Sequence, residues 1–229
     1  MSKKNQEEND NVIVDVQEVY SKTEHFIENN KKTISIVIGG IIVAVGLYFA
    51  YTKMYIAPME IEAQSSMFMA EKYFEKDSLD KAINGDGIND GFVEIIESYS
   101  GTKSANLAHY YLGLSYLKTG KFQEAIDELK SFSSNDIMVS SIAIGAIGDA
   151  HMELGEVDEA ISFYEKAAKN NENELTTPMY LFKAGIGYEE KGDYAKAIEK
   201  YTVIKTDYLE SSEGRTIEKY LARAEALKK

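Results

Sequence analysis

The sequence predicts an all-α fold: a solenoid of antiparallel helical hairpins that follows a single membrane-spanning helix. One pattern occurs three times in the C-terminal half, at intervals of 35 and 37 residues, which is typical of a repeat architecture. Apolar residues recur with helical spacing through much of the 229 residues, and only two prolines interrupt them. A stretch of twenty residues near the N-terminus carries no charge and is long enough to cross a bilayer.

Residues 33–52 (TISIVIGGIIVAVGLYFAYT) are the predicted membrane anchor. A helix of this length spans about 30 Å, the thickness of the hydrocarbon core. The 32 residues before it are too many for the charged start of a cleaved signal peptide, so we expect the anchor to be retained. Residues 1–32 are then a tail that begins with a polar segment, and we expect this tail to be partly disordered.

Basic residues beside the anchor predict its orientation. Lys22, Lys31 and Lys32 lie within fifteen residues on the N-terminal side, whereas only Lys53 does so on the C-terminal side. Because basic residues near an anchor are retained in the cytoplasm, we expect a single-pass protein with a cytoplasmic N-terminus. The residues after Lys53 are then expected outside the cytoplasm.

Three segments, residues 109–129, 144–164 and 181–201, align with one another without gaps. Each has a glycine at its fifth position, a second glycine seven residues later and an alanine five residues after that. These positions are Gly113, Gly120 and Ala125 in the first segment, Gly148, Gly155 and Ala160 in the second, and Gly185, Gly192 and Ala197 in the third.

Helix packing explains these small residues. The first glycine and the alanine lie where two antiparallel helices cross, because a small side chain lets the backbones approach closely. The second glycine ends the first helix, where a left-handed backbone conformation is favourable without a Cβ. Leu129, Tyr164 and Tyr201 are expected to close the second helix of each hairpin.

The period and the small-residue crossings resemble the tetratricopeptide repeat (TPR). We predict three such repeats in residues 106–209. Residues 53–105 are expected to form a degenerate first repeat and a connecting helix, and residues 210–229 a capping helix.

The whole arrangement resembles the ancillary, TPR-containing subunit of the bacterial Sec translocon in its Bacteroidetes-type form. Residues 74–111 and the sequence YTKMYIAP at the exit of the anchor carry this resemblance. It implies a protein of the bacterial inner membrane with its repeats in the periplasm. It also implies partners among the Sec translocon subunits, a periplasmic chaperone-isomerase and translocating chains.

Composition excludes several functions. A net charge of −13 repels the phosphates of nucleic acids, so nucleic-acid binding is not expected. The chain has no cysteine, which excludes disulfides and zinc–thiolate sites. Its three histidines show no metal-ligand spacing, and neither a phosphate-binding loop nor a nucleophile elbow is present. We therefore expect no catalysis and no cofactor.

Residues 86–97 (DGINDGFVEIIE) contain the one candidate for a metal site. Asp86, Asp90 and Glu97 stand at ligand positions of a calcium-binding loop, but Ile88 takes the place of another ligand. Asn and Gly residues also favour an ordinary turn between helices. The sequence leaves open whether this loop binds calcium.

A concave groove lined by the first helix of each repeat is the expected protein-binding site. The predicted groove residues are Leu107, Tyr110, Leu114, Leu117, Met179, Phe182 and Ile186, with Asp149 and Met152 of the second repeat on the same face. The first repeat helix is apolar nearly all round, so it is either a binding surface or covered by residues 92–99.

The repeats predict a non-catalytic scaffold that binds other proteins, and the family resemblance implies a chaperone-like accessory subunit of the Sec translocon. The alternative is a TPR adaptor for envelope assembly or cell division that has no part in translocation.

Overall fold

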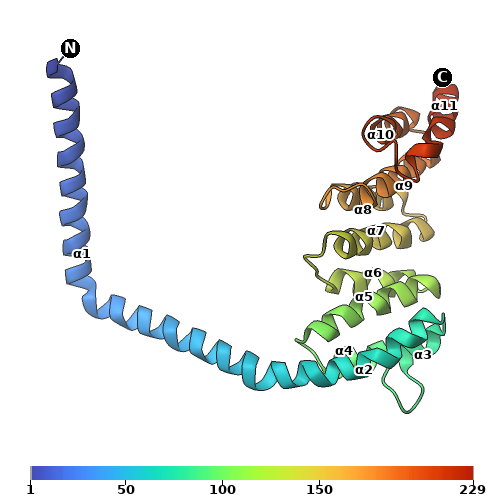
Figure 1. The fold of residues 1–229 in the computed structure, drawn as a ribbon, viewed down its shortest axis with the longest axis horizontal. Coiled ribbons are helices and arrows are strands. Elements are labelled where there is room, and N and C mark those ends of the chain that lie inside the picture. Colours follow the sequence, from blue (N-terminus) through green and yellow to red (C-terminus); the bar gives the residue numbers. More distant parts are fainter. Residues whose placement is uncertain (1, 229) are drawn as a thin grey trace. The chain divides into compact units, whose positions relative to one another are not determined.

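The computed structural model describes residues 2–228, with side chains for residues 22, 24 and 26–228, and every element within this range is helical (Figure 1). The chain divides into two compact units, Met1–Ile56 and Ala57–Lys229. The all-α expectation is therefore confirmed.

The first unit consists of helix α1 (Ser2–Tyr51) and a π-helical turn, η1 (Thr52–Ile56). Helix α1 includes residues 2–32 of the tail, and partial disorder of this tail stays a prediction. No glycine or proline interrupts the chain between residue 2 and Gly39, and the helical backbone continues through this segment. The π-turn precedes Pro58, whose ring nitrogen cannot donate to the carbonyl four residues earlier.

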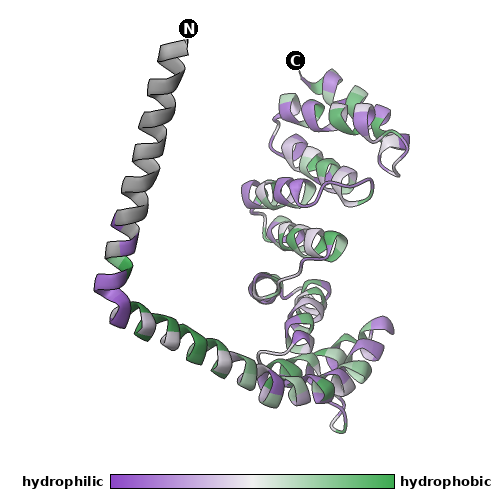
Figure 2. Ribbon diagram, turned by 60° about the vertical axis from the view of Figure 1, so that its left-hand side comes forward, coloured by the Kyte–Doolittle hydropathy of each residue, from purple (hydrophilic) through white to green (hydrophobic). Residues whose placement is uncertain are grey.

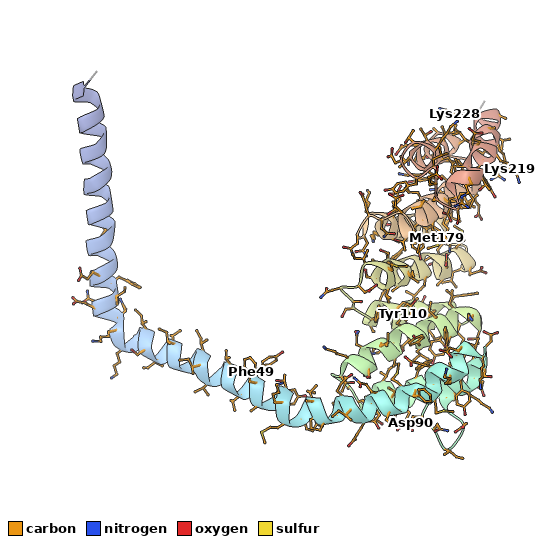
Figure 3. All side chains as sticks on the ribbon, in the orientation of Figure 1. Phe49, Asp90, Tyr110, Met179, Lys219 and Lys228 are labelled. Carbon is orange, nitrogen blue, oxygen red and sulfur yellow. The ribbon has the colours of Figure 1, made fainter. Side chains whose placement is uncertain are left out.

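Among the residues that the structure describes, none in the apolar half of α1 is buried. Figure 2 shows a continuous hydrophobic segment along it, and the Phe49 side chain projects from the helix in Figure 3. Ile42 and Leu47 are 66% and 67% exposed. Among the described residues, this is the helix that is long and apolar enough to cross a membrane.

The second unit begins with helices α2 (Ala57–Glu75), α3 (Leu79–Asn84) and α4 (Phe92–Ser98). Helices α3 and α4 follow α2 as two short pieces separated by the loop of residues 85–91. Met67, Phe92 and Ile95 are buried in a core that α2, α3 and α4 share with the next helix. The start of α2 is tied to the start of the next helix. The Glu60 carboxylate accepts hydrogen bonds from the backbone N–H groups of Lys103 and Ser104.

Three antiparallel hairpins follow and stack one upon another (Figure 1). They are α5 (Lys103–Lys118) with α6 (Phe122–Ser131), α7 (Ile137–Glu153) with α8 (Val157–Lys169), and α9 (Thr176–Glu190) with α10 (Tyr194–Asp207). A 3-10 turn, η2 (Gly214–Thr216), leads into α11 (Ile217–Leu227), which packs on α10. The last helix therefore begins later than the start of the expected capping segment.

The crossing glycines lie against the residues that close the second helices. A Cβ added at Gly113, Gly148 or Gly185 would come within 2.6, 2.8 and 2.3 Å of Leu129, Tyr164 and Tyr201, respectively. The alanines of the pattern, Ala125, Ala160 and Ala197, are fully buried. The hairpins thus cross where the small residues allow close approach.

The second glycine of each repeat ends its first helix in the left-handed region. The φ angles of Gly120, Gly155 and Gly192 are +78°, +75° and +76°. An L side chain at these positions would be strained, which explains why the pattern places glycine there.

Candidate protein-binding groove

The seven predicted groove residues belong to α5 and α9, the first helices of the first and third repeats. All seven are half-buried in the structure: Leu107, Tyr110, Leu114, Leu117, Met179, Phe182 and Ile186. Tyr110 and Met179 are labelled in Figure 3. Neighbouring elements therefore cover part of each of these seven side chains.

Helix α4 covers one side of α5. The ring of Phe92 stacks on that of Tyr111, with centroids 5.4 Å apart and an angle of 8° between the planes. Leu107 packs against the core that contains Phe92. The apolar character of the first repeat helix is thus explained by packing against α4, one of the two alternatives that the sequence left open.

The other α5 residues of the predicted groove contact the second repeat. Tyr110, Leu114 and Leu117 pack against a core that includes Ile126 and Ile147. These side chains therefore join the first repeat to the second.

Helix α11 covers part of the third repeat. The Phe182 ring meets the Tyr220 ring edge to face, with centroids 4.6 Å apart. Glu189, also on α9, forms an ion pair with Arg223 of α11, and its Oε2 lies 2.7 Å from Arg223 Nη2. The C-terminal helix therefore lies against Phe182, one of the residues that we expected to contact a partner.

An open cleft remains in the middle of the stack, where the first helices of the three repeats come together. Its volume is about 540 Å³. Leu117, Phe122 and Met152 supply its apolar lining, and the other lining residues are Lys118, Gly120, Asp149, Glu153, Tyr164 and Lys183. Among the seven predicted residues, Leu117 lines this cleft.

The cleft has a polar centre made of side chains from two repeats. Lys183 Nζ lies 2.7 and 2.8 Å from the two carboxylate oxygens of Asp149. The Tyr164 hydroxyl donates to the same carboxylate at 2.8 Å. Burial, with the nearby charge of Asp149, raises the pKa of the Tyr164 hydroxyl well above its usual range, so it remains a donor at neutral pH.

Sequence reasoning placed Asp149 on the concave face but missed Lys183 and Tyr164. In the repeat pattern Lys183 stands two residues before the crossing glycine, and Tyr164 closes a second helix. An acid in the first helix of one repeat and a lysine in the first helix of the next was the available signal. It becomes informative only when the stacking of the repeats is known.

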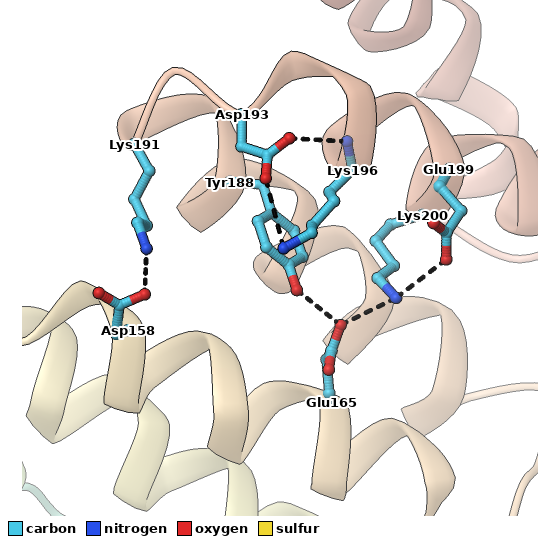
Figure 4. A network of polar contacts seen from close by, with 8 residues as sticks. All are labelled: Asp158, Glu165, Tyr188, Lys191, Asp193, Lys196, Glu199 and Lys200. Atoms are coloured by element: carbon cyan, nitrogen blue, oxygen red, sulfur yellow. Dashed lines mark hydrogen bonds and ion pairs between the residues drawn. The ribbon is translucent and has the colours of Figure 1, made fainter.

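A polar network on the side of the stack joins the second and third hairpins (Figure 4). The Glu165 carboxylate of α8 accepts from Tyr188 Oη at 3.0 Å and from Lys200 Nζ at 2.8 Å. Burial alone would raise the pKa of Glu165, but these two donors outweigh it and lower that pKa. Burial and the hydrogen bond to Glu165 together raise the pKa of Tyr188 to about 12. These interactions help to hold successive repeats in one arrangement.

The loop considered for calcium binding is organised by internal hydrogen bonds. The Asp86 carboxylate accepts from the Tyr73 hydroxyl and from the backbone N–H groups of Ile88 and Asn89. These donors lower its pKa, with Tyr73 the largest cause. Asp90 accepts from Ser66 at 3.0 Å. No three acidic or histidine side chains within the described part of the chain are grouped as metal ligands.

Two of the histidines pair with carboxylates of their own hairpins. His109 Nδ1 lies 2.6 Å from Glu128, and His151 Nδ1 lies 2.6 Å from Glu156. The His151 ring also stacks on Phe163 with centroids 5.2 Å apart. Packing and hairpin closure account for both positions.

Comparison with known proteins supports the repeat assignment. Family models of the tetratricopeptide repeat match residues 107–136, 143–174 and 180–210. No curated protein matches the chain in sequence. The predicted TPR-type solenoid is therefore confirmed, and these matches reach no finer family.

Solved structures share the same fold. One holds the nearly identical TPR-like repeats of a protein named as a kinesin light chain from Podosopora anserina, with 17% identity and a TM-score of 0.55 over 73% of this chain and 87% of that one. Its Q17M variant gives the same values. The MamA protein is 22% identical, with a TM-score of 0.52 over 72% of this chain and 89% of that one. At these identities the likeness concerns the fold alone.

Proposed function

We propose that this chain is a non-catalytic scaffold that binds other proteins through the concave face of its repeats and is held at a membrane by α1. The observation that carries the proposal is the cleft of about 540 Å³, to which the first helices of all three repeats contribute. Tetratricopeptide stacks generally bind proteins on the surface that their curvature creates. Apolar side chains beside polar and charged ones are typical of surfaces that bind proteins.

The apolar half of α1 supports the membrane part of the proposal. None of the residues in its most hydrophobic window is buried. A continuous exposed apolar surface of this kind is unfavourable in water and is covered favourably by lipid. The aromatic residues Tyr48, Tyr51 and Tyr55 gather toward one end, where such rings favour the membrane interface.

We propose more narrowly an accessory subunit of the Sec translocon, with the repeats outside the cytoplasm. The support is the resemblance of residues 74–111 and of the YTKMYIAP segment, together with the lysine excess before the anchor. Residues 54–229 carry 19 basic and 31 acidic side chains, so a basic partner would be attracted by the field of the repeats. Translocon subunits, a periplasmic chaperone-isomerase and translocating chains are the proposed partners.

Crosslinking tests the site and the partner together. A photoreactive residue placed at Met152 in the cleft should capture translocon subunits in membranes. The same residue at Glu225, exposed on α11, is the matched control and should capture far less. Capture of cell-wall or division proteins at Met152 would instead favour the envelope adaptor. Equal capture at Met152 and Glu225 would exclude the groove as the protein-binding site.

The structure also decides which variants suit this test. Leu114 and Phe182 pack against neighbouring elements, so replacing both with alanine should lower stability as well as binding. Variants of Asp149 and Lys183 are better because both side chains are about one third exposed, at 31% and 36%.

Cysteine labelling tests the orientation. Ser2→Cys should resist an impermeant thiol reagent in intact cells, because the N-terminus is expected in the cytoplasm. Ser100→Cys, at an exposed position, should react once the outer membrane is permeable. The chain has no natural cysteine, so labelling reports the introduced residue alone. Labelling at Ser2→Cys but not at Ser100→Cys would reverse the proposed topology.

A further inference from the structure

The polar centre of the cleft has the chemistry of a site for an organic cation. The Tyr164 and Tyr180 rings are nearly parallel, with centroids 6.3 Å apart and 15° between their planes. Lys183 Nζ lies 5.7 Å from the Tyr164 centroid and 5.8 Å from the Tyr180 centroid. Its positive charge therefore meets two aromatic rings and the Asp149 carboxylate at once, and each of these attracts a cation.

We propose that this is a pocket for a lysine or arginine side chain of a partner protein, and that Lys183 occupies it in the free chain. The inference rests on the proposed scaffold function and names the partner's chemistry. The Tyr164 hydroxyl holds the Asp149 carboxylate in place whichever cation is bound. Lys183 has a long flexible stem and is partly exposed, so it is able to leave the carboxylate.

The surroundings of the pocket favour an incoming cation. Glu153 is exposed and lines the same cleft, which adds a second negative charge. Lys118 also lines the cleft, but its Nζ is 2.9 Å from Asp77 and 5.1 Å from the Phe74 ring centroid. The charge of Lys118 is thus directed toward the C-terminal end of α2 and away from Asp149.

The apolar side of the cleft defines the rest of the partner segment. Leu117, Phe122 and Met152 line the space beside the charged centre. They are suited to the aliphatic stem of the incoming basic residue and to an apolar neighbour in the partner's sequence. The partner is therefore expected to present a basic residue flanked by apolar ones.

Chemical rescue of a vacated pocket tests the inference on the full-length chain in detergent. Lys183→Ala removes the resident cation and should lower the melting temperature, because Asp149 loses its ion pair. n-Butylammonium, which has the shape of a lysine side chain, should restore part of that loss in Lys183→Ala and change the wild type much less. n-Butanol at the same concentration, which lacks the charge, should have no such effect.

Three further variants complete this test. Rescue should disappear when Asp149→Asn is added to Lys183→Ala, since the amide keeps a partner for Tyr164 but loses the charge. Lys191→Ala removes a different ion pair of the same two repeats, with Asp158, and should show no rescue. If Lys183→Ala does not fold, Lys183→Met keeps the aliphatic bulk, and direct binding of n-butylammonium is measured by NMR. Rescue or binding that persists without Asp149, or that is absent in every folded Lys183 variant, would overturn the pocket.

A second measurement separates the pocket from the scaffold function. With the photoreactive residue at Met152, Lys183→Met should increase partner crosslinking several-fold, and Asp149→Asn should reduce it. Crosslinking that neither variant changes would overturn the cation pocket and leave the scaffold proposal standing. Absence of crosslinking in every variant would reject the scaffold proposal, while the rescue experiment would still decide whether the pocket binds a cation.

Discussion

Two strongly apolar helices of this chain have opposite surroundings. The anchor segment, residues 33–52, belongs to α1 except for Thr52 and leaves nearly all of its side chains exposed, and none in its most hydrophobic window is buried. Helix α7 (Ile137–Glu153) buries Ala143, Ala146 and Ile147 among the neighbouring hairpins. Both helices are hydrophobic in composition. Protein covers the apolar side chains of α7, whereas in our proposal lipid covers those of the anchor.

The difference lies in where small and polar residues stand. In α7 the Ser141 hydroxyl donates to the Asn170 carbonyl at 2.6 Å, and Asp149 pairs with Lys183. Gly148 faces a tyrosine ring of the neighbouring helix. In α1 a Cβ added at Gly40 would meet nothing within 4 Å. Polar side chains within an apolar helix therefore indicate protein neighbours, and a centre without polar side chains indicates lipid, whereas glycine occurs in both helices.

A charge introduced in the middle of α7 and of the anchor segment should give the largest difference between the two helices. Ala146→Lys places an ammonium group at a position that is 4% exposed, and it should destabilise the repeats by about 3–5 kcal/mol. Val43→Lys should leave their melting temperature unchanged and weaken membrane insertion by about 2.5–3.5 kcal/mol. Circular dichroism of the full-length protein and membrane fractionation measure the two effects. Similar melting of both variants would contradict the comparison.

Added bulk at a glycine should show a smaller contrast. Gly148→Leu pushes a side chain against Tyr164, where even a Cβ would lie 2.8 Å from the ring, and should cost about 1–3 kcal/mol or more. Gly40→Leu, in open space, is the matched control and should not change the unfolding of the repeats. Equal melting temperatures for the two proteins would mean that the hairpins do not cross at Gly148.

The network of Figure 4 predicts a pH effect that is confined to the repeats. The pKa of Tyr188 is raised to about 12 from an ordinary value near 10. A raised pKa means that its stabilising contribution is complete below pH 10 and is lost as the pH rises toward 12. The melting temperature of Tyr188→Phe should therefore fall less between pH 9 and pH 11 than that of the wild type. Parallel pH profiles would show that the bond to Glu165 contributes nothing.

The smallest effect is expected in the connections between repeats. Glu174 is exposed in the loop before α9, and Glu174→Gln should change the free energy of unfolding by less than about 0.5 kcal/mol. Chemical denaturation of this variant beside Gly148→Leu supplies the measurement. A loss comparable to that of Gly148→Leu would place Glu174 in an interaction that the structure does not show.

Patterns within single helices were enough to predict much of this molecule. The uncharged run of residues 33–52 indicated one apolar helix, because its length matches a bilayer and needs no partner in the chain. Gly120, Gly155 and Gly192 marked the ends of the first helices, since a positive φ is a local requirement. The crossing glycines were predictable for a similar reason, because close approach of two helices excludes a side chain at that point.

Contacts between repeats were beyond such patterns. Asp149 and Lys183 stand 34 residues apart, and only the stacking angle of the hairpins brings their charges together. The covering of Phe182 by Tyr220 likewise depends on where α11 packs. The loop of residues 85–91 divides α3 from α4, and contacts with α2, such as the bond between Ser66 and Asp90, hold it. Burial and pairing are properties of neighbours distant in the chain, and the folded stack alone decides which residues become neighbours.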